Sequence, residues 1–194
     1  MQKEDLGSAA EALSRAFATN PNTLATATGE TVPAHRLETA FAGRIKHSPS
    51  RVFIAEVDGR IVGAMRIIEW PRCQASLMQN LKVAPYILGS IGGLGRLRRA
   101  MKLRSIWKKN DPNKPHWHLD PLGVTPEWQG KGVGSQMMEF YCDIIDKKGI
   151  EAYHETDKEQ NVPFYQRFGF EVIGKEKVNG ATNWFMLRPA KKGK

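Results

Sequence analysis

The sequence contains few cysteines and no long hydrophobic run. Its two cysteines, Cys73 and Cys142, lack the spacing usual for metal ligands, and so low a count is typical of a reducing compartment. The longest uncharged apolar run, Val83–Gly95, is broken by glycines and a proline and is far shorter than the ~18 residues of a membrane span. The start, Met1–Asp5, is too polar for a signal peptide. We therefore expect a cytoplasmic protein with no metal and no membrane insertion.

Acidic residues are missing from one segment of the chain. Residues 71–110 contain nine of the 29 lysines and arginines and no aspartate or glutamate, whereas the other 20 basic residues face 20 acidic ones. The formal charge of +9 therefore belongs to this segment alone. A basic segment is most often a solvated face, but nucleic-acid binding through residues 72–109 is an alternative. The segment contains only two aromatic residues, Tyr86 and Trp107, so stacking on nucleic-acid bases is poorly supported. Nucleic acid is therefore not the expected partner.

Length and composition suit one ordinary globular domain. The 194 residues are 41% hydrophobic and 25% charged. We expect a single domain over residues 1–190, with a basic insertion over 71–115 and a basic tail over 191–194. The local patterns predict helices over 8–18 (begun by a Ser8/Glu11 capping box), 33–47 and 94–109, a hairpin around Asp58-Gly59, and a terminal hairpin around Asn179-Gly180.

The most informative stretch runs from His116 to Met138. It begins as a strand that ends at Val124 and closes as an amphipathic helix. Between them lies the loop Gln129–Ser135, with three glycines in five positions. Glycine lets a ligand approach the backbone, and the N-terminus of a helix presents free N–H groups and a positive dipole to anions. The loop is therefore predicted to bind a pyrophosphate.

The spacing of this loop decides among known phosphate motifs. A P-loop requires Gly-Lys-Ser/Thr at its end, and Gly134 is followed by Ser135-Gln136, so that motif is excluded. The dinucleotide fingerprint is also excluded, because Ser135 stands in place of its third glycine. The pattern present is Gln-x-x-Gly-x-Gly after a strand, and it resembles the acetyl-CoA loop of the GNAT superfamily of N-acetyltransferases. A second block, Asn161–Phe170, resembles the family's N-x-x-x-x-Y-x-x-x-G-F signature.

The resemblance implies both a fold and a cofactor. The fold is mixed α/β (α+β): a central mixed, mostly antiparallel sheet flanked by helices, whose fourth and fifth strands splay apart to admit the cofactor. The basic insertion would then lie between the third and fourth strands of the family. The cofactor is acetyl-CoA (coenzyme A). The residues matching the family's cofactor contacts are Leu122, Gly123, Val124, Gln129, Gly130, Lys131, Gly132, Val133, Gly134, Ser135, Asn161 and Tyr165.

Acetyl transfer to an amine requires proton donors and acceptors. Tyr165 matches the family's position for the general acid that protonates the leaving thiolate, although a plain core aromatic is the alternative. His118 matches the place of a catalytic base in some members, and Asp120 shares its face of the strand. His154 and Glu155, on the next strand, are further candidates, and each of the four is alternatively a polar lining of the site.

The resemblance implies transfer to a primary amine of a small molecule by a direct ternary complex, with a protein acceptor also open. The two motifs are most similar to a puromycin-acetyltransferase-like branch. A monomer or a homodimer is expected. A non-catalytic acyl-CoA-binding regulatory module is an alternative from another class.

Overall fold

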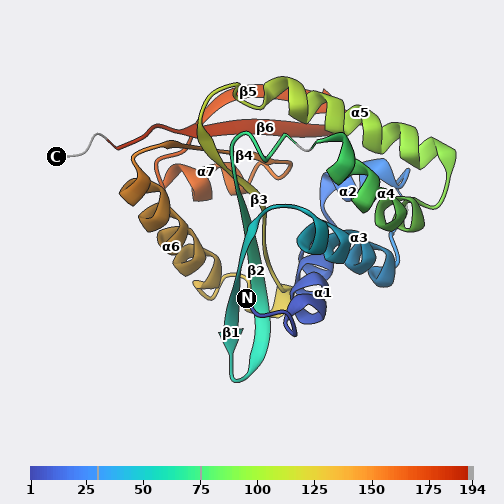
Figure 1. Cartoon of the computed structure of the whole chain (residues 1–194), viewed down its shortest axis with the longest axis horizontal. Coiled ribbons are helices and arrows are strands. Elements are labelled where there is room, and N and C mark those ends of the chain that lie inside the picture. The colour runs from blue at the N-terminus through green and yellow to red at the C-terminus, as the bar shows by residue number, and fades with distance from the viewer. Residues whose placement is uncertain (30, 75, 192–194) are drawn as a thin grey trace.

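The computed structural model describes residues 1–29, 31–74 and 76–191 (Figure 1). The helices are α1 (Leu6–Phe17), α2 (Pro21–Thr26), α3 (Ala34–His47), α4 (Leu77–Ile91), α5 (Leu94–Asn110), the 3-10 turn η1 (Pro126–Trp128), α6 (Val133–Lys148) and α7 (Asn161–Gln166). The strands are β1 (Arg51–Val57), β2 (Arg60–Glu69), β3 (His116–Val124), β4 (Glu151–Thr156), β5 (Glu171–Val178) and β6 (Ala181–Arg188).

Six strands form one mixed sheet in the order β1-β2-β3-β4-β6-β5. All neighbours are antiparallel except β3 and β4, which are parallel. The predicted mixed, mostly antiparallel sheet flanked by helices is thereby confirmed. Within the described strands, the β3–β4 pairing ends at His118 and Tyr153, and the two strands then part. The described chain has no strand before α1, so the parting strands are its third and fourth, and residues 71–115 connect its second and third.

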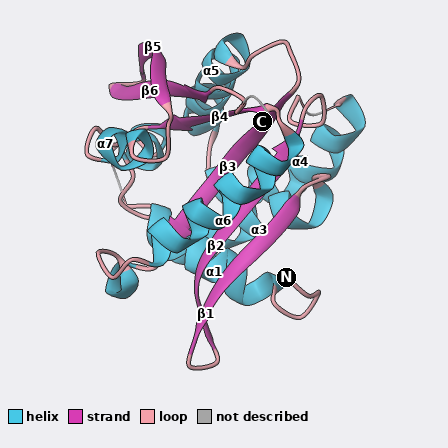
Figure 2. Cartoon of the chain, turned by 90° about the vertical axis from the view of Figure 1, so that its left-hand side faces the viewer, coloured by secondary structure: helices cyan, strands magenta, loops and turns pink. Residues whose placement is uncertain are grey.

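Helices cover both faces of the sheet, and each face has its own apolar core. Figure 2 shows α6 in front of the sheet, with α1 and α3 behind it. The larger core joins the sheet to α6 and includes Trp117, Met138 and Tyr141, all at most 2% exposed. The smaller core, around Leu13 and Ile45, joins α1 and α3 to the opposite face. The side chains of β3 alternate accordingly, because Trp117 and Leu119 belong to the core that contacts α6, whereas His118 between them projects to the opposite face.

Turn chemistry predicted from the sequence is confirmed at both hairpins. Asp58 and Gly59 adopt positive φ (49° and 73°) between β1 and β2, and Asn179 and Gly180 do so (54° and 98°) between β5 and β6. These are the conformations of a type I′ turn, which joins antiparallel strands with the correct twist. Gly149 ends α6 in the left-handed region, at φ 62°.

Three helical predictions need correction. Helix α1 begins at Leu6 rather than Ser8, and Asp5 precedes it, so the Ser8/Glu11 capping box is wrong. The short helix α2 is missing from the prediction, and its Pro21 fits the first turn of a helix, where the missing N–H is not needed. Helix α4 is missing from the prediction, since Pro85 inside it obscured a capping box of Ser76 and Gln79. Residues 192–194 of the predicted basic tail lie outside the described chain.

The contact between α1 and β3 depends on Gly123. An added Cβ at this position would lie 2.9 Å from Ala16 Cβ and 2.9 Å from Leu13 Cδ2. We predict that Gly123→Ala lowers the free energy of unfolding by about 1–3 kcal/mol through overpacking. Urea unfolding measures this, with Gly89→Ala as the control, because an added Cβ at Gly89 meets nothing within 4 Å. Equal stability of the two variants would contradict this packing.

An ion pair connects the last strand to α6. Arg188 donates to both carboxylate oxygens of Asp146, at 2.5 and 3.0 Å, and Lys191 lies 2.7 Å from the same carboxylate. Hydrogen bonding from Arg188, helped by Lys191, lowers the pKa of Asp146. A lowered folded pKa stabilises the protein above the unfolded value of about 3.9, and this stabilisation is lost as the pH falls through the folded pKa.

We therefore predict that Asp146→Asn lowers stability at pH 7 by about 1 kcal/mol, a value limited by solvent access, and that the deficit shrinks below pH ~4. Urea midpoints at several pH values measure it, with exposed Asp143→Asn on the same helix as control. A deficit of the same size at pH 7 and at pH ~3 would contradict the assignment.

Candidate active site

The parting of β3 and β4 leaves one backbone edge of β3 after His118 without a partner among the strands of residues 1–29, 31–74 and 76–191. On its other edge this part of β3 is paired with β2, from Met65–Leu122 to Gly63–Val124. A free strand edge can accept an extended amide-containing chain in the manner of an added strand. The carbonyl of Val124 already accepts a hydrogen bond from Gln129 Nε2 at 2.8 Å. Gln129 therefore fixes the loop to the end of the strand.

The predicted phosphate loop leads directly into α6. Gly130 and Gly132 have φ values of 74° and 87°, which favour glycine, and Gly132 is the N-cap of the helix. An added Cβ at either glycine meets nothing within 4 Å, so the space beside this backbone is open. The first-turn N–H groups of a helix have no intrahelical acceptor, and they carry the positive end of the dipole. This arrangement is suited to a phosphate group.

Lys131, in the middle of the loop, contacts an aromatic ring of η1. Its ammonium stands over the Trp128 ring, 4.8 Å from the centroid, and so packs against η1. Beyond η1, a cavity of about 670 Å³ is lined from α1, the β1–β2 hairpin and Trp128. The cavity is lined by more acidic than basic side chains: Asp5, Glu11, Glu56 and Glu127 against Arg15 and Arg60. Its charge does not suit an anionic cofactor.

Tyr165 lies on α7 among aromatic rings. Its ring centroid is 3.8 Å from that of His154 on β4 and 5.1 Å from that of Phe164, and the residue is 8% exposed. Phe164 also approaches the loop, since an added Cβ at Gly134 would lie 3.7 Å from its ring. Burial raises the pKa of Tyr165 above its usual value, with Asp157 adding to the shift. The phenol is therefore protonated at neutral pH and able to donate.

The neighbours of Tyr165 are tied into the ends of β4 and α7. Burial lowers the pKa of His154 to about 3, so its imidazole is neutral, and within the described residues neither ring nitrogen has a hydrogen-bond partner. Asn161, at the first position of α7, donates to Thr156 Oγ1 at 3.3 Å. This bond holds the start of α7 against the end of β4, where the two strands have parted.

On the opposite face of the sheet, His118 pairs with Glu155. His118 Nε2 lies 3.0 Å from Glu155 Oε2, and both side chains are close to nine-tenths buried. Burial alone would lower the pKa of His118, but the charge and the hydrogen bond of Glu155 raise it well above its usual value, with Cys73 adding to the shift. Burial raises the pKa of Glu155 as well. His118 is thus the protonated partner of a carboxylate, which is a poor state for the free base that the sequence suggested.

Asp120 is held by two arginines. Arg66 on β2 donates to its carboxylate at 2.8 Å and to its backbone carbonyl at 2.5 Å, and Arg44 on α3 lies 3.9 Å from the other carboxylate oxygen. Burial would raise the pKa of Asp120, but these cations lower it to about 2. The sequence correctly put Asp120 on the face of His118, but such a pKa makes it a structural anion rather than a proton acceptor. Arg66 and Arg44, which explain this, carry no sequence motif.

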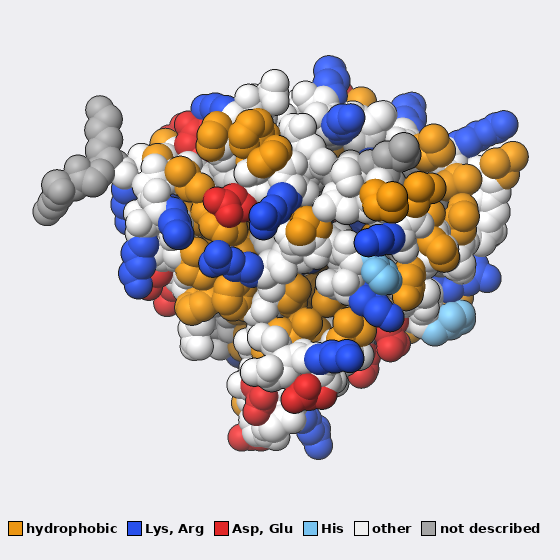
Figure 3. Space-filling model, viewed as in Figure 1, with side chains coloured by type: hydrophobic (Ala, Val, Ile, Leu, Met, Phe, Trp, Pro, Cys, Tyr) orange, Lys and Arg blue, Asp and Glu red, His pale blue; other side chains and the backbone are white. Residues whose placement is uncertain are grey.

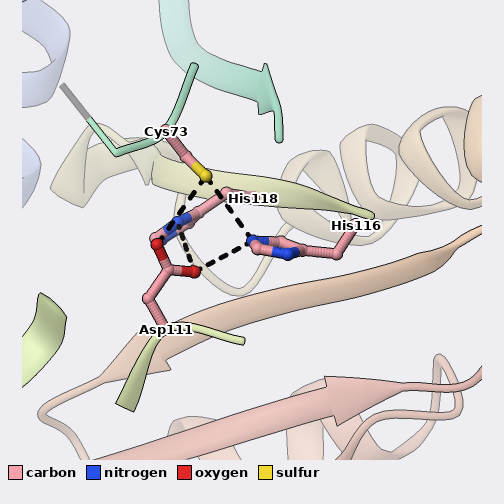
Figure 4. A group of neighbouring side chains, drawn as sticks. All are labelled: Cys73, Asp111, His116 and His118. Carbon is pink, nitrogen blue, oxygen red and sulfur yellow. Dashed lines mark hydrogen bonds and ion pairs between the residues drawn. The ribbon is translucent and has the colours of Figure 1, made fainter. Parts of the chain in front are cut away.

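Two further residues join this face. Asp111 and Cys73 lie beside His116 and His118, with Asp111 Oδ1 2.9 Å from His116 Nε2 (Figure 4). Burial opposes the change, but the contacts of its ring nitrogens with the Asp111 carboxylate, the Cys73 sulfur and the Lys114 backbone carbonyl raise the pKa of His116 to about 9. Sequence reasoning missed this group because its members come from three separate segments.

The basic segment forms α4 and α5, which pack beside α3 and α2. Arg99 donates to the Ala25 carbonyl at 3.2 Å, Trp107 Nε1 to Asn183 Oδ1 at 3.0 Å, and Lys109 pairs with Glu176 at 3.1 Å. Figure 3 shows hydrophobic side chains interspersed with basic ones over these helices, on the right of the view. The exposed apolar residues there are Met78, Leu81, Leu88, Leu94 and Met101. Polar contacts therefore attach the basic segment to the rest of the protein. Its exposed surface carries both basic and apolar side chains.

The open glycine loop, the helix that begins there and the parted parallel strands together form an α/β arrangement suited to a phosphate-bearing ligand. Comparison with known proteins specifies the class of protein. The sequence model of the Acetyltransferase (GNAT) family matches residues 17–170. The chain belongs to this family.

Individual relatives match over shorter spans. An uncharacterised N-acetyltransferase of Schizosaccharomyces pombe is 37% identical over 65 residues, 34% of this chain and 26% of that protein. A mycothiol acetyltransferase of Propionibacterium freudenreichii is 33% identical over 72 residues, 34% of this chain and 23% of that protein. The chain thus spans about a quarter of the length of these two relatives.

Solved protein structures share this fold. A structure titled as histone acetyltransferase HPA2 and related acetyltransferase, from Corynebacterium glutamicum, superposes with a TM-score of 0.71. It is 19% identical, and the match covers 100% of this chain and 95% of that one. At such identity the likeness shows the fold alone. Among the described residues, no helix is long and apolar enough to cross a membrane.

Proposed function

We propose that this protein transfers an acetyl group from acetyl-CoA to a primary amine of a small molecule. The observation that carries the proposal is the glycine loop with positive φ, which opens at the N-terminus of α6 beside the free edge of β3. The loop N–H groups would hold the pyrophosphate, and the Leu122–Val124 edge would hold the pantetheine amides. The thioester would then lie where β3 and β4 part, between the aromatic group of Tyr165 and the His118–Glu155 pair.

Each catalytic step is assigned to a named group. The amine nitrogen attacks the thioester carbonyl, forming the C–N bond, and the C–S bond breaks as the thiolate leaves. Tyr165, neutral at working pH, gives its proton to the thiolate. Glu155 takes the proton that the attacking amine nitrogen loses, through Oε1, a buried oxygen that has no hydrogen-bond partner within the described residues. Proton exchange with solvent then restores both Glu155 and Tyr165. His118 and Asp120 act as positioning residues, since His118 holds the other oxygen of Glu155.

The acceptor class follows from charge. Residues 71–110 bring nine basic residues and no acidic one to the helices α4 and α5 and their flanks. Two further cations, Arg44 and Arg66, lie against Asp120. This field opposes a polycationic acceptor such as a lysine-rich tail and favours a small amine that also carries an anionic or neutral group. Neither the puromycin-acetyltransferase-like branch nor the oligomeric state, monomer or homodimer, has support beyond the sequence.

Release of free CoA from acetyl-CoA, followed with a thiol reagent across a panel of amines, tests the proposal. We expect amine-dependent release with small amines and little with lysine-rich peptides. Tight acetyl-CoA binding with no turnover on any amine would instead support the non-catalytic module. Steeply salt-dependent retention on heparin, lost on charge reversal of residues in α5, would support nucleic-acid binding. A cytoplasmic location stays a prediction, which the two free cysteines support.

A further inference from the structure

Four side chains from three separate segments point toward one another on the face of the sheet opposite α6 (Figure 4). Cys73 follows β2, Asp111 follows α5, and His116 and His118 stand at alternate positions at the start of β3. Alternate positions of a strand share one face, so both imidazoles project to the same side. One ligand atom from each residue lies within 4.8 Å of the corresponding atoms of the other three.

The separations are those of ligands around one small ion. Tetrahedral ligands at about 2.0–2.3 Å from zinc stand roughly 3.3–3.8 Å apart. Cys73 Sγ is 3.7 Å from His116 Nε2 and 3.7 Å from Asp111 Oδ2, and His118 Nδ1 is 3.8 Å from Asp111 Oδ1. The shortest separation, 2.9 Å, joins His116 Nε2 to Asp111 Oδ1.

Two polar atoms that point into the group of four side chains lack the well-aligned hydrogen bonds that buried polar atoms normally make. Within the described residues, His118 Nδ1 and Asp111 Oδ1 are buried and make no well-aligned hydrogen bond, and the 2.9 Å approach of Asp111 Oδ1 to His116 Nε2 is an ion-pair contact. Buried polar atoms are rarely left unpaired, because the lost hydration is costly. An ion at the centre of the group would satisfy both atoms together.

The outward nitrogens are already held, as they are in metal-ligating histidines. His116 Nδ1 lies 2.8 Å from the Lys114 carbonyl, and His118 Nε2 lies 3.0 Å from Glu155 Oε2. A ligating histidine normally gives its second nitrogen to a carbonyl or a carboxylate, which fixes the ring and its tautomer. Both histidines here direct one nitrogen inward and bond the other.

The geometry of the group fits a cysteine–histidine–aspartate nucleophile site less well than it fits a metal site. In such a site the carboxylate binds the histidine nitrogen that is remote from the thiol. Here Asp111 Oδ1 and Cys73 Sγ both approach the same nitrogen, His116 Nε2, while Nδ1 is bonded to the Lys114 carbonyl. Two groups converging on one nitrogen point to a shared central ligand.

We propose that Cys73, Asp111, His116 and His118 bind one Zn²⁺ ion as a structural site. Thiolate and imidazole donors select zinc over magnesium and calcium, which require oxygen ligands, and the two anionic ligands balance the dication. Four protein ligands leave no open position, so the ion is not a catalyst. It connects both ends of the segment 71–115 to the start of β3 and, through His118, orients Glu155. The proposal does not depend on acetyl transfer.

Metal content and a cobalt spectrum test the site on the full chain. We expect about one zinc per chain after purification without chelator. In the chelator-treated protein, Co²⁺ should produce the intense d–d bands of a tetrahedral ion and a thiolate-to-cobalt charge-transfer band. Cys73→Ser should abolish the charge-transfer band, whereas Cys142→Ser, which changes the other cysteine, on α6, should keep it.

Two measurements on the unsubstituted protein remain informative if a variant fails to fold. Zinc at a hundredfold excess over its Kd should raise Tm by about 5–10 °C, and it should slow alkylation of Cys73 at least about tenfold because metal-bound thiolate is shielded. A protein folded by circular dichroism that binds no zinc or cobalt would overturn the proposal. A charge-transfer band that persists in folded Cys73→Ser would overturn it as well.

Discussion

Gly132→Asp is expected to weaken acetyl-CoA binding by at least about 100-fold. The new carboxylate would stand at the N-cap of α6, where the phosphate is expected, and two like charges about 4 Å apart at an effective dielectric of ~20 repel by about 4 kcal/mol. The fold should tolerate the change. Gly132 has φ 87° with open space beside it, and aspartate adopts the left-handed region more readily than most residues. Isothermal titration calorimetry with acetyl-CoA measures the effect.

Gly149→Asp is the matched control, because it changes the other end of the same helix. Gly149 also has positive φ, 62°, and an added Cβ there meets nothing within 4 Å. A carboxylate at the C-terminus opposes the helix dipole and lowers stability by about 0.3–1 kcal/mol, but acetyl-CoA affinity should stay within about twofold because the dipole interaction is local. If the two variants bind acetyl-CoA equally well, the loop does not hold the diphosphate.

Tyr165→Phe is expected to lower kcat by about 10²–10⁴-fold, the usual contribution of a positioned general acid. The ring contacts with His154 and Phe164 remain, so the variant should fold and bind acetyl-CoA with an unchanged Kd. A loss confined to kcat separates proton donation from packing, because a purely structural tyrosine would leave kcat unchanged while the protein remains folded. Steady-state kinetics with the best amine of the panel measures it.

Tyr141→Phe removes a different buried hydroxyl and serves as the comparison. Tyr141 is fully buried on α6, and its hydroxyl donates to the Trp117 carbonyl at 3.0 Å. Its loss should cost about 1 kcal/mol of stability and leave kcat unchanged. Should Tyr165→Phe retain kcat within about twofold, the general-acid role would be wrong and the core-aromatic alternative would hold.

Local chemistry explains which parts of the fold the sequence predicted. Asp58-Gly59 and Asn179-Gly180 determine their own turns through positive φ, so both hairpins follow from two residues each. The loop before α6 is equally local, because its glycines, helix start and preceding strand are contiguous. Helix α4 was missed because Pro85 lies inside it, and the start of α1 was misplaced because a Ser8/Glu11 pattern also occurs within helices.

The polar groups on the other face could not be predicted, because their partners are distant in sequence. Asp120 depends on Arg66 and Arg44, and Cys73 lies 38 positions from Asp111. No spacing rule connects these residues; only the sheet register and the return of α5 bring them together. The His-x-His spacing of 116 and 118 was the one local signal for the cluster, and it identifies only two of the four residues.

Backbone amide NMR during titration with acetyl-CoA tests the central claim most directly. The account predicts saturable shifts concentrated in the amides of 130–135 and of the β3 edge at 122–124, with NADH causing none at equal concentration. Saturable shifts that instead concentrate elsewhere, such as around the acidic cavity between α1 and the β1–β2 hairpin, would contradict it.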